Sequence, residues 1–208
     1  MNIFRIIADY SHVLAIIGLL VNIVRTKSCE GVSGKTQALY LVVFVTRYTD
    51  LFTSLTWYLT IFKAVFLVLT FSTLVLIYHT YKKTYDKNID TFQVLIVVLP
   101  SIACGVIFSA ERTSIQEDLW TFSIFLESVA ILPQLYMIYQ TGEAKTITVH
   151  YLLPLGLYRA LYIANWVWRY YYERYFDPVA IVCGCIQTMF YILFVTMPVF
   201  WSGTKVEI

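Results

Sequence analysis

Apolar residues along this chain gather into seven long runs that are separated by short polar segments. Each run is close to the length of about 20 helical residues that crosses a bilayer. A transmembrane barrel would instead alternate apolar and polar residues over segments of about ten, and no such alternation occurs. The pattern predicts an all-α integral membrane protein with seven transmembrane helices, over residues 3–24, 36–57, 62–81, 93–110, 117–139, 148–171 and 179–201.

The composition agrees with this prediction. Hydrophobic residues make up 59% of the 208 residues, charged residues make up 13%, and the mean hydropathy is +0.70. A soluble domain of this size has too little interior to bury so many apolar side chains. The first run is not a cleaved signal, because Asp9 and His12 interrupt it and no small-residue cleavage site follows. We therefore expect a single membrane domain over residues 1–208, embedded in the lipid bilayer.

Cationic residues fall mainly on one side of this seven-span arrangement. The opposite segments hold only Lys63, Arg112 and Arg174. The positive-inside rule then predicts a lumenal or external amino terminus and a cytosolic carboxy terminus. With a net charge of +2 and no basic stripe, nothing indicates a nucleic acid partner. The residues on the cation-rich side are Arg25, Lys27, Lys35, Lys82, Lys83, Lys87, Lys145 and Lys205.

Residues 30–52 and 143–166 resemble each other weakly. Both run from an acidic, hydroxyl-bearing loop into a span that contains an arginine, Arg47 or Arg159. This predicts two parallel three-helix repeats, an arrangement found in small transporters whose sites lie at the repeat interface. The predicted units are residues 1–81 and 117–201, linked by the helix 93–110.

Four predicted spans carry polar residues at helical spacing, which places them on one face of each helix. A charge at the bilayer centre costs at least about 2.5–3.5 kcal/mol, so it must face a partner or a cavity. We interpret the four polar stripes as the wall of a common cavity. The stripes are Arg5, Asp9 and His12; Arg47, Asp50 and Ser54; Glu117, Trp120 and Glu127; and Tyr158, Tyr162, Asn165 and Arg169.

Structural explanations compete with this interpretation. The arginines and carboxylates could pair as contacts between helices. Arg5 and Arg169, near the ends of their spans, could reach the lipid headgroups. The aromatic residues of 168–175 could form an interfacial belt.

The chemistry of the stripes indicates a ligand of mixed charge. Guanidinium groups match carboxylates, so the arginines favour a ligand with more than one carboxylate. Asp50 and Glu117, with Trp120 and Trp166 nearby, suit a cation. Either a short peptide or an amino acid fits. Because imidazole titrates at a pH of about 6.5, His12 could respond to mild acid, or it could be satisfied by a tyrosine hydroxyl.

No catalytic motif accompanies these stripes. The sequence has no Gly-rich phosphate loop, no His/Cys metal spacing and no Ser/His/Asp set. We predict no enzymatic activity, no metal site and no cofactor. Pro133–Gln134 is interpreted as a kink with a hydrogen-bonding neighbour. The four cysteines, which we predict to be buried thiols rather than disulfides, are Cys29, Cys104, Cys183 and Cys185.

Longer motifs extend the interpretation. "MNIFRIIADYSHVLAII", "CEGVSGKTQ", "TRYTDLFTS", "LWTFSIFLESVAILPQLYMI", "TGEAKTIT" and "LGLYRALYIANWVWR" together resemble the ER lumen protein-retaining receptor (KDEL receptor) family, over about residues 1–178. The resemblance implies a SWEET-like, PQ-loop-like fold in the ER and Golgi membranes. It also implies a receptor that captures escaped ER residents by a C-terminal Lys/His-Asp-Glu-Leu signal, binding in acid and releasing at neutral pH.

The resemblance further implies roles for single residues. Arg47 and Tyr48 would hold the terminal carboxylate, Arg5 the ligand's Glu and Arg169 its Asp. The residues that would receive its Lys or His are Asp50, Glu117, Trp120 and Trp166. The rest of the wall would be Ser54, Tyr162 and Asn165, and the pH-responsive lock would be His12, Tyr158 and Glu127. Arg159 is expected to pair with Glu127 inside the bundle.

Two features depart from the family pattern. Leu193 stands where the family usually has an aspartate implicated in return traffic. The tail "SGTKVEI" has Lys205 alone, where a lysine-rich tail engages the vesicle coat (COPI/COPII). Either a truncated chain or a diverged member would show these features.

Two other classes of protein remain open. A transporter of the same architecture, for a sugar or an amino acid, would need a site that opens to both sides, whereas the cytosolic half of the second span, "LYLVVFV", has no polar stripe. A structural subunit would leave Arg47 and Asp50 without an assigned partner.

Overall fold

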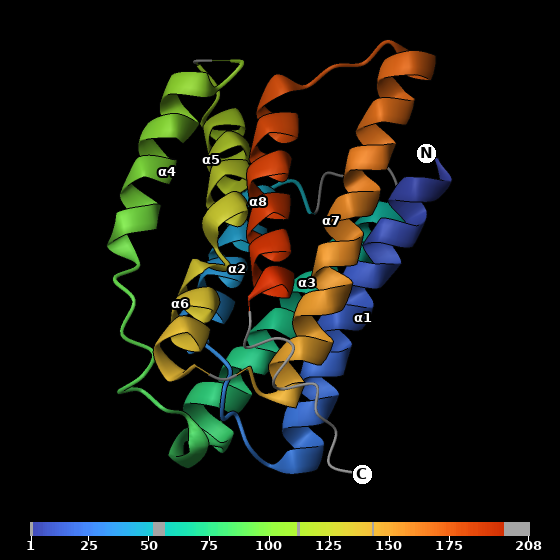
Figure 1. Cartoon of the computed structure of the whole chain (residues 1–208). Coiled ribbons are helices and arrows are strands. Elements are labelled where there is room, and N and C mark those ends of the chain that lie inside the picture. The colour runs from blue at the N-terminus through green and yellow to red at the C-terminus, as the bar shows by residue number, and fades with distance from the viewer. Residues whose placement is uncertain (1, 52–56, 112, 143, 198–208) are drawn as a thin grey trace.

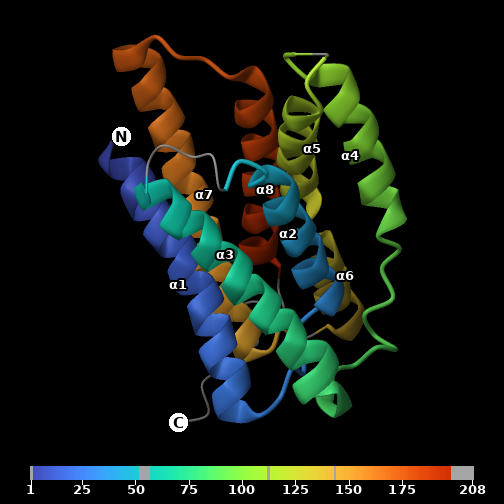
Figure 2. The same cartoon turned by 180° about the vertical axis from the view of Figure 1, so that it is seen from behind.

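The protein is a bundle of helices that run side by side (Figures 1 and 2). The computed structural model describes residues 2–51, 57–111, 113–142 and 144–197, and its regular elements in these ranges are all helical. Ser54, Arg112 and Lys205 lie outside them. The elements are α1 (Ile3–Thr26), α2 (Gly34–Arg47), α3 (Trp57–Val75), the π-helical turn η1 (Leu76–Thr80), the 3₁₀ turn η2 (Lys82–Thr84), α4 (Leu95–Phe108), α5 (Ile115–Val129), α6 (Leu132–Thr141), α7 (Thr146–Glu173) and α8 (Pro178–Thr196).

Several helices begin at a polar side chain that accepts a backbone N–H from the first turn, which satisfies one of the otherwise unpaired donors there. These residues are Asn2 for α1, Ser33 for α2, Ser114 for α5 and Asp177 for α8. At the other end of α6, Gly142 has a φ of 66°, the left-handed conformation that glycine adopts readily. Local sequence signals therefore set many of the helix ends.

The helices pack in a pattern that links the two halves of the chain. α1 lies along α7, and α2 lies against α5. α3 packs on α1 and α2, while α8 packs on α5 and α7, and α4 packs mainly on α5 (Figures 1 and 2). One apolar core includes Leu19 and Leu155, and a second includes Phe44 and Leu126.

Among the described residues, four helical stretches are long and apolar enough to cross a membrane: Ile3–Thr26, Leu59–Thr80, Ile115–Thr141 and Pro178–Thr196. α4 is a shorter apolar helix. Large apolar side chains such as Leu14, Val106 and Met189 lie exposed on the outer faces, where acyl chains would cover them in a bilayer. These features agree with an all-helical membrane protein.

The predicted span 36–57 is wrong at its carboxyl end. α2 ends at Arg47, and Tyr48 is its C-cap residue. The chain then turns, with the Leu51 N–H donating to the Tyr48 carbonyl oxygen at 3.1 Å. Hydropathy does not reveal this end, because the residues that follow include further apolar and aromatic side chains.

The predicted span 117–139 is interrupted rather than continuous. α5 ends at Val129 and α6 begins at Leu132, with Pro133 in the first turn of α6. Proline has no N–H to donate to the carbonyl four residues earlier, so the helical ladder breaks here. Lys63, which the charge count assigned to a connecting segment although the predicted span 62–81 contains it, lies within α3.

The four cysteines are free thiols. The predicted burial is confirmed for Cys29 and Cys183 and is wrong for Cys185, which is exposed. Cys185 lies on α8, many of whose apolar residues are exposed, and a thiol is apolar enough to need no polar partner there.

Candidate functional site

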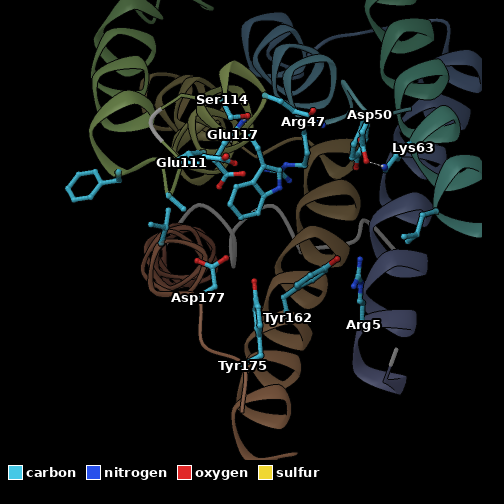
Figure 3. A pocket seen from close by; sticks show the side chains of 18 of the residues that line it. Arg5, Arg47, Asp50, Lys63, Glu111, Ser114, Glu117, Tyr162, Tyr175 and Asp177 are labelled. Atoms are coloured by element: carbon cyan, nitrogen blue, oxygen red, sulfur yellow. Dashed lines mark hydrogen bonds and ion pairs between the residues drawn. The ribbon is translucent and has the colours of Figure 1, made fainter. Parts of the chain in front are cut away.

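A cavity of about 960 Å³ opens among the helices near the amino-terminal end of α1 (Figure 3). We call it the larger cavity. Arg5 on α1, Arg47 at the end of α2, Glu117 on α5 and Tyr162 on α7 all line it. Clefts of about 300–1,000 Å³ are typical of sites for small ligands.

A second cavity of about 330 Å³, the smaller cavity, shares Arg47, Tyr48 and Trp120 with the first. It is also lined by His12 and Glu127. Every predicted site residue except Ser54, which lies outside the described residues, lines at least one of the two. They are Arg5, His12, Arg47, Tyr48, Asp50, Glu117, Trp120, Glu127, Tyr158, Tyr162, Asn165, Trp166 and Arg169.

Glu127 is the centre of a buried ion cluster. Its Oε2 accepts from Arg47 Nη1 at 2.5 Å, and its Oε1 lies 2.6 Å from Arg159 Nη2. The Tyr158 hydroxyl donates to the same Oε1 at 2.5 Å. The predicted pairing of Arg159 with Glu127 is confirmed. Two guanidiniums around one carboxylate leave this cluster with a net positive charge, which favours an anion nearby.

Arg47 also anchors the end of α2 to α5. Its Nε donates to Ser123 Oγ at 3.0 Å. Its Nη2 is buried, and among the described residues it has no hydrogen-bond partner. A buried donor without a partner is uncommon in proteins and is satisfied when a ligand supplies an acceptor.

His12 lies within an aromatic cage and is 7% exposed. Its ring stacks on Tyr158, with the centroids 4.1 Å apart and the planes at 11°. Phe66 lies 4.7 Å away and Phe44 5.8 Å away. The sequence allowed a hydrogen bond from a tyrosine hydroxyl to His12. Tyr158 does not donate this bond, because its hydroxyl donates to Glu127.

A second polar layer lies closer to the amino terminus. The Tyr162 hydroxyl donates to Asp9 Oδ1 at 2.7 Å, and Arg5 Nε lies 4.0 Å from Asp9 Oδ2. Asn2 Nδ2 donates to Asn165 Oδ1 at 2.7 Å, which joins α1 to α7. The stripes of the first and sixth predicted spans therefore face one another.

Two further predicted ligand-binding charges, besides Arg5 and Arg47, have partners within the protein. Lys63 Nζ lies 2.6 Å from Asp50 Oδ2 (Figure 3). Arg169 Nε lies 2.6 Å from Glu173 Oε2, and the guanidinium carbon lies 3.8 Å from the centroid of the Tyr175 ring. The argument that a structural subunit would leave Arg47 and Asp50 unpartnered is therefore wrong, since each has an ionic partner.

No group of three or more His, Cys, Asp or Glu side chains in the described part of the chain is placed to hold a metal ion. The site instead offers guanidiniums, carboxylates, hydroxyls and indoles. These groups suit a polar ligand with charges of both signs.

Comparison with known proteins decides the family. The family model described as "ER lumen protein retaining receptor" matches residues 28–169. The chain belongs to this family. It is 54% identical over 192 residues to ER lumen protein-retaining receptor 3 of Xenopus tropicalis, covering 92% of this chain and 89% of that protein. It is 53% identical to ER lumen protein-retaining receptor 2 of Homo sapiens, covering 92% of this chain and 90% of that protein.

Three residues at or beside the cavities were not predicted from the sequence. Lys63 was counted only as a loop charge, and Asp177 and Ser123 were not considered, although Lys63 and Asp177 line the larger cavity and Ser123 holds Arg47. Helical spacing could not identify Lys63 as the partner of Asp50, because the two residues do not share a helix. Lys63 lies on α3, and Asp50 follows the end of α2.

Proposed function

We propose that this chain is a receptor for the C-terminal Lys/His-Asp-Glu-Leu type of retention signal and that it returns escaped ER residents from the Golgi to the ER. Its family and its relatives are named as ER lumen protein-retaining receptors, which supports this function. The name is that of a receptor rather than of an enzyme. The cavity supplies a site of suitable chemistry and size for a short peptide with both signs of charge.

One observation carries the binding mode: the buried Arg47 Nη2 without a partner among the described residues. A guanidinium binds a carboxylate through two parallel hydrogen bonds. We propose that Arg47, with Tyr48, holds the terminal carboxylate of the peptide. Arg47 is itself part of the net-positive cluster around Glu127, so a carboxylate bound to it also compensates that charge.

We give the remaining site residues the roles that the resemblance to the family implies. Arg5 is proposed to pair with the ligand's Glu and Arg169 with its Asp, which requires each arginine to exchange its present partner, Asp9 or Glu173, for the ligand. The cationic end of the peptide goes to Asp50, Glu117, Trp120 and Trp166. The wall is completed by Ser54, Tyr162 and Asn165.

We also propose that acid strengthens binding through His12, Glu127 and Tyr158. His12 faces Tyr158 on α7, Phe44 on α2 and Phe66 on α3, and it lines the smaller cavity with Arg47, Glu127 and Arg159. A carboxylate that enters this net-positive region makes protonation of His12 easier. By linkage, a proton taken up on binding makes the ligand bind more tightly as the pH falls.

The proposed topology has seven spans in two parallel three-helix repeats, residues 1–81 and 117–201, linked by the helix 93–110. The packing of α1 on α7 and of α2 on α5 supports this, because each pair joins the first helix of one unit to the second of the other. We place the amino terminus in the lumen and the carboxy terminus in the cytosol. Vesicle coats of the COPI/COPII type are the proposed cytosolic partners, although Leu193, which is exposed on α8, departs from the family pattern.

The transporter alternative receives no support from the relatives' names. Loop contacts also argue against a site that opens to both ends. At the cation-rich end, the Gln134 side chain accepts from the Ser33 N–H and donates to the Gly31 carbonyl oxygen. Thr148 donates to the same carbonyl. These bonds hold the loop between α1 and α2 against α6 and α7 at this end of the bundle.

The test is binding of a labelled peptide ending in Lys-Asp-Glu-Leu to the detergent-purified protein at pH 5.5 and 7.4. We expect tight binding in acid only, and loss of binding when the peptide is C-terminally amidated. Arg47→Lys keeps the charge but loses the fork of donors, so it should weaken binding about tenfold or more. Lys35→Arg, at the opposite end of the bundle, is the control. No binding at either pH would contradict the proposal.

A further inference from the structure

Lys63 places a cation in the wall of the larger cavity. It lies in the second turn of α3, and its side chain is only 15% exposed. Its ammonium nitrogen lies 2.6 Å from Asp50 Oδ2, and both residues line the cavity. A lysine that is covered to this degree normally has a carboxylate partner, since an unpaired charge there would be costly.

The carboxylates of the larger cavity therefore differ in their availability to a cation. Asp50, beside Lys63, lies on one side of the cavity, and Glu117 lies on the other (Figure 3). Among the described residues, Glu117 has no ion-pair partner, and the indole of Trp120 lines the same cavity. A cationic group of the ligand therefore meets the Asp50 carboxylate, which Lys63 already neutralises, and the Glu117 carboxylate, which Lys63 does not neutralise.

We propose that Lys63 is a specificity-determining residue of this receptor. It neutralises Asp50 and so weakens the preference for a cationic residue at the fourth position from the carboxyl end of the peptide. A ligand lysine must displace Lys63 from Asp50 or lie close to a like charge, and both cost free energy. A neutral polar side chain such as glutamine neither displaces Lys63 nor is repelled by it. The substrate class therefore includes signals of the type Gln-Asp-Glu-Leu. This inference rests on the receptor function proposed above.

The experiment compares dissociation constants for peptides ending in Lys-Asp-Glu-Leu and Gln-Asp-Glu-Leu at pH 5.5. For the wild-type protein we expect the two constants to agree within about threefold. Lys63→Met removes the ammonium and keeps most of the side-chain length. It should raise the preference for the lysine peptide by about three- to tenfold.

Matched variants separate the ion pair from general charge effects. Lys63→Arg keeps the cation and should keep the wild-type ratio. Arg174→Gln removes one positive charge from an exposed C-cap outside the cavity and should leave the ratio unchanged. In an Asp50→Asn background, Lys63→Met should shift the preference by a smaller factor than in wild type, because no Asp50 carboxylate is released for the ligand lysine and only the like-charge repulsion is relieved.

Each outcome decides the matter. Binding of both peptides with the same ratio in wild type and Lys63→Met overturns the inference and leaves the receptor function standing. If Lys63→Met does not fold, the wild-type ratio alone decides: a lysine preference of more than about threefold overturns the inference. Failure of the wild-type protein to bind either peptide overturns the receptor function, and the inference with it.

Discussion

Glu127 shows how one residue couples the stability of this bundle to the wall of its cavities. Its carboxylate is 6% exposed and pairs with Arg47 from α2 and Arg159 from α7. Removing one partner from a buried ion cluster costs more than the cluster contributes, because the remaining charges stay buried without compensation. The same residue that fixes three helices also keeps the guanidinium of Arg47 at the cavity.

Glu127→Gln should therefore destabilise the protein strongly. It leaves the guanidiniums of Arg47 and Arg159 buried without their carboxylate, at a cost of about 3–5 kcal/mol. The measurement is the thermal unfolding temperature of the protein in detergent. Glu30→Gln is the control, since the ion pair of Glu30 with Lys145 is exposed and should be worth less than about 1 kcal/mol. Equal shifts for the two variants would contradict the buried-cluster argument.

His12→Ala tests the proposed pH response at the same scale. If the proton affinity of His12 changes tenfold between free and bound protein, ligand affinity changes about tenfold across the transition. The variant should bind the Lys-Asp-Glu-Leu peptide weakly at pH 5.5 and show little difference between pH 5.5 and 7.4. His150→Ala, on an exposed position of α7, should keep the full response. If His12→Ala kept the full change in peptide affinity between pH 5.5 and 7.4, the proton taken up on binding would have to be assigned to another group, such as Glu127.

At the scale of elements, the break between α5 and α6 places Gln134 where it contacts the loop before α2. Because Pro133 interrupts the helical ladder, the Gln134 N–H can also donate to Thr36 Oγ1 at 3.0 Å. The Gln134 side chain, which is fully buried, holds the loop before α2 through Ser33 and Gly31. The short Pro-Gln motif thus fixes the loop between α1 and α2.

Gln134→Ala should loosen that loop. Cys29, within the loop, is fully buried, and burial raises the pKa of its thiol, so it should react slowly with maleimide at neutral pH. Loss of the Gln134 hydrogen bonds should expose the thiol and return its pKa toward the ordinary value, raising the rate several-fold. Mass spectrometry that resolves the modification of Cys29 gives the rate. Gln140→Ala, an exposed position on the same helix, should leave it unchanged.

Hydropathy predicted most of the helices, but not the features that define the cavity. Runs of apolar residues identify helices well where lipid and core select the same residue types, as in α1 and α8. The end of α2 at Arg47 was missed because Arg47 is held by the distant residues Ser123 and Glu127, and because the local turn at Tyr48 has no signal in the hydropathy. The Lys63–Asp50 pair was missed for the same reason. Helical spacing compares residues within one helix and cannot predict partners on another.

At the scale of the whole molecule, the packing pattern matches that expected for two related halves. α3 packs on both α1 and α2, and α8 packs on both α5 and α7. The third helix of each proposed unit thus covers the other two. Residues from both units line the cavities, including Arg47 from the first and Arg159 and Tyr162 from the second. A site at the interface of two parallel repeats is consistent with this arrangement.

The orientation in the membrane is the remaining prediction at this scale. The α1–α2 and α6–α7 connections lie at one end of the bundle, and the amino terminus and the α7–α8 connection lie at the other (Figure 1). The first end carries Lys27 and Lys145, so the positive-inside rule places it in the cytosol. An Asn-x-Ser/Thr acceptor added before Met1 should then be glycosylated in microsomes. The same acceptor added after Ile208 should stay unmodified, and its glycosylation would place the cavity on the cytosolic side, where lumenal cargo cannot reach it.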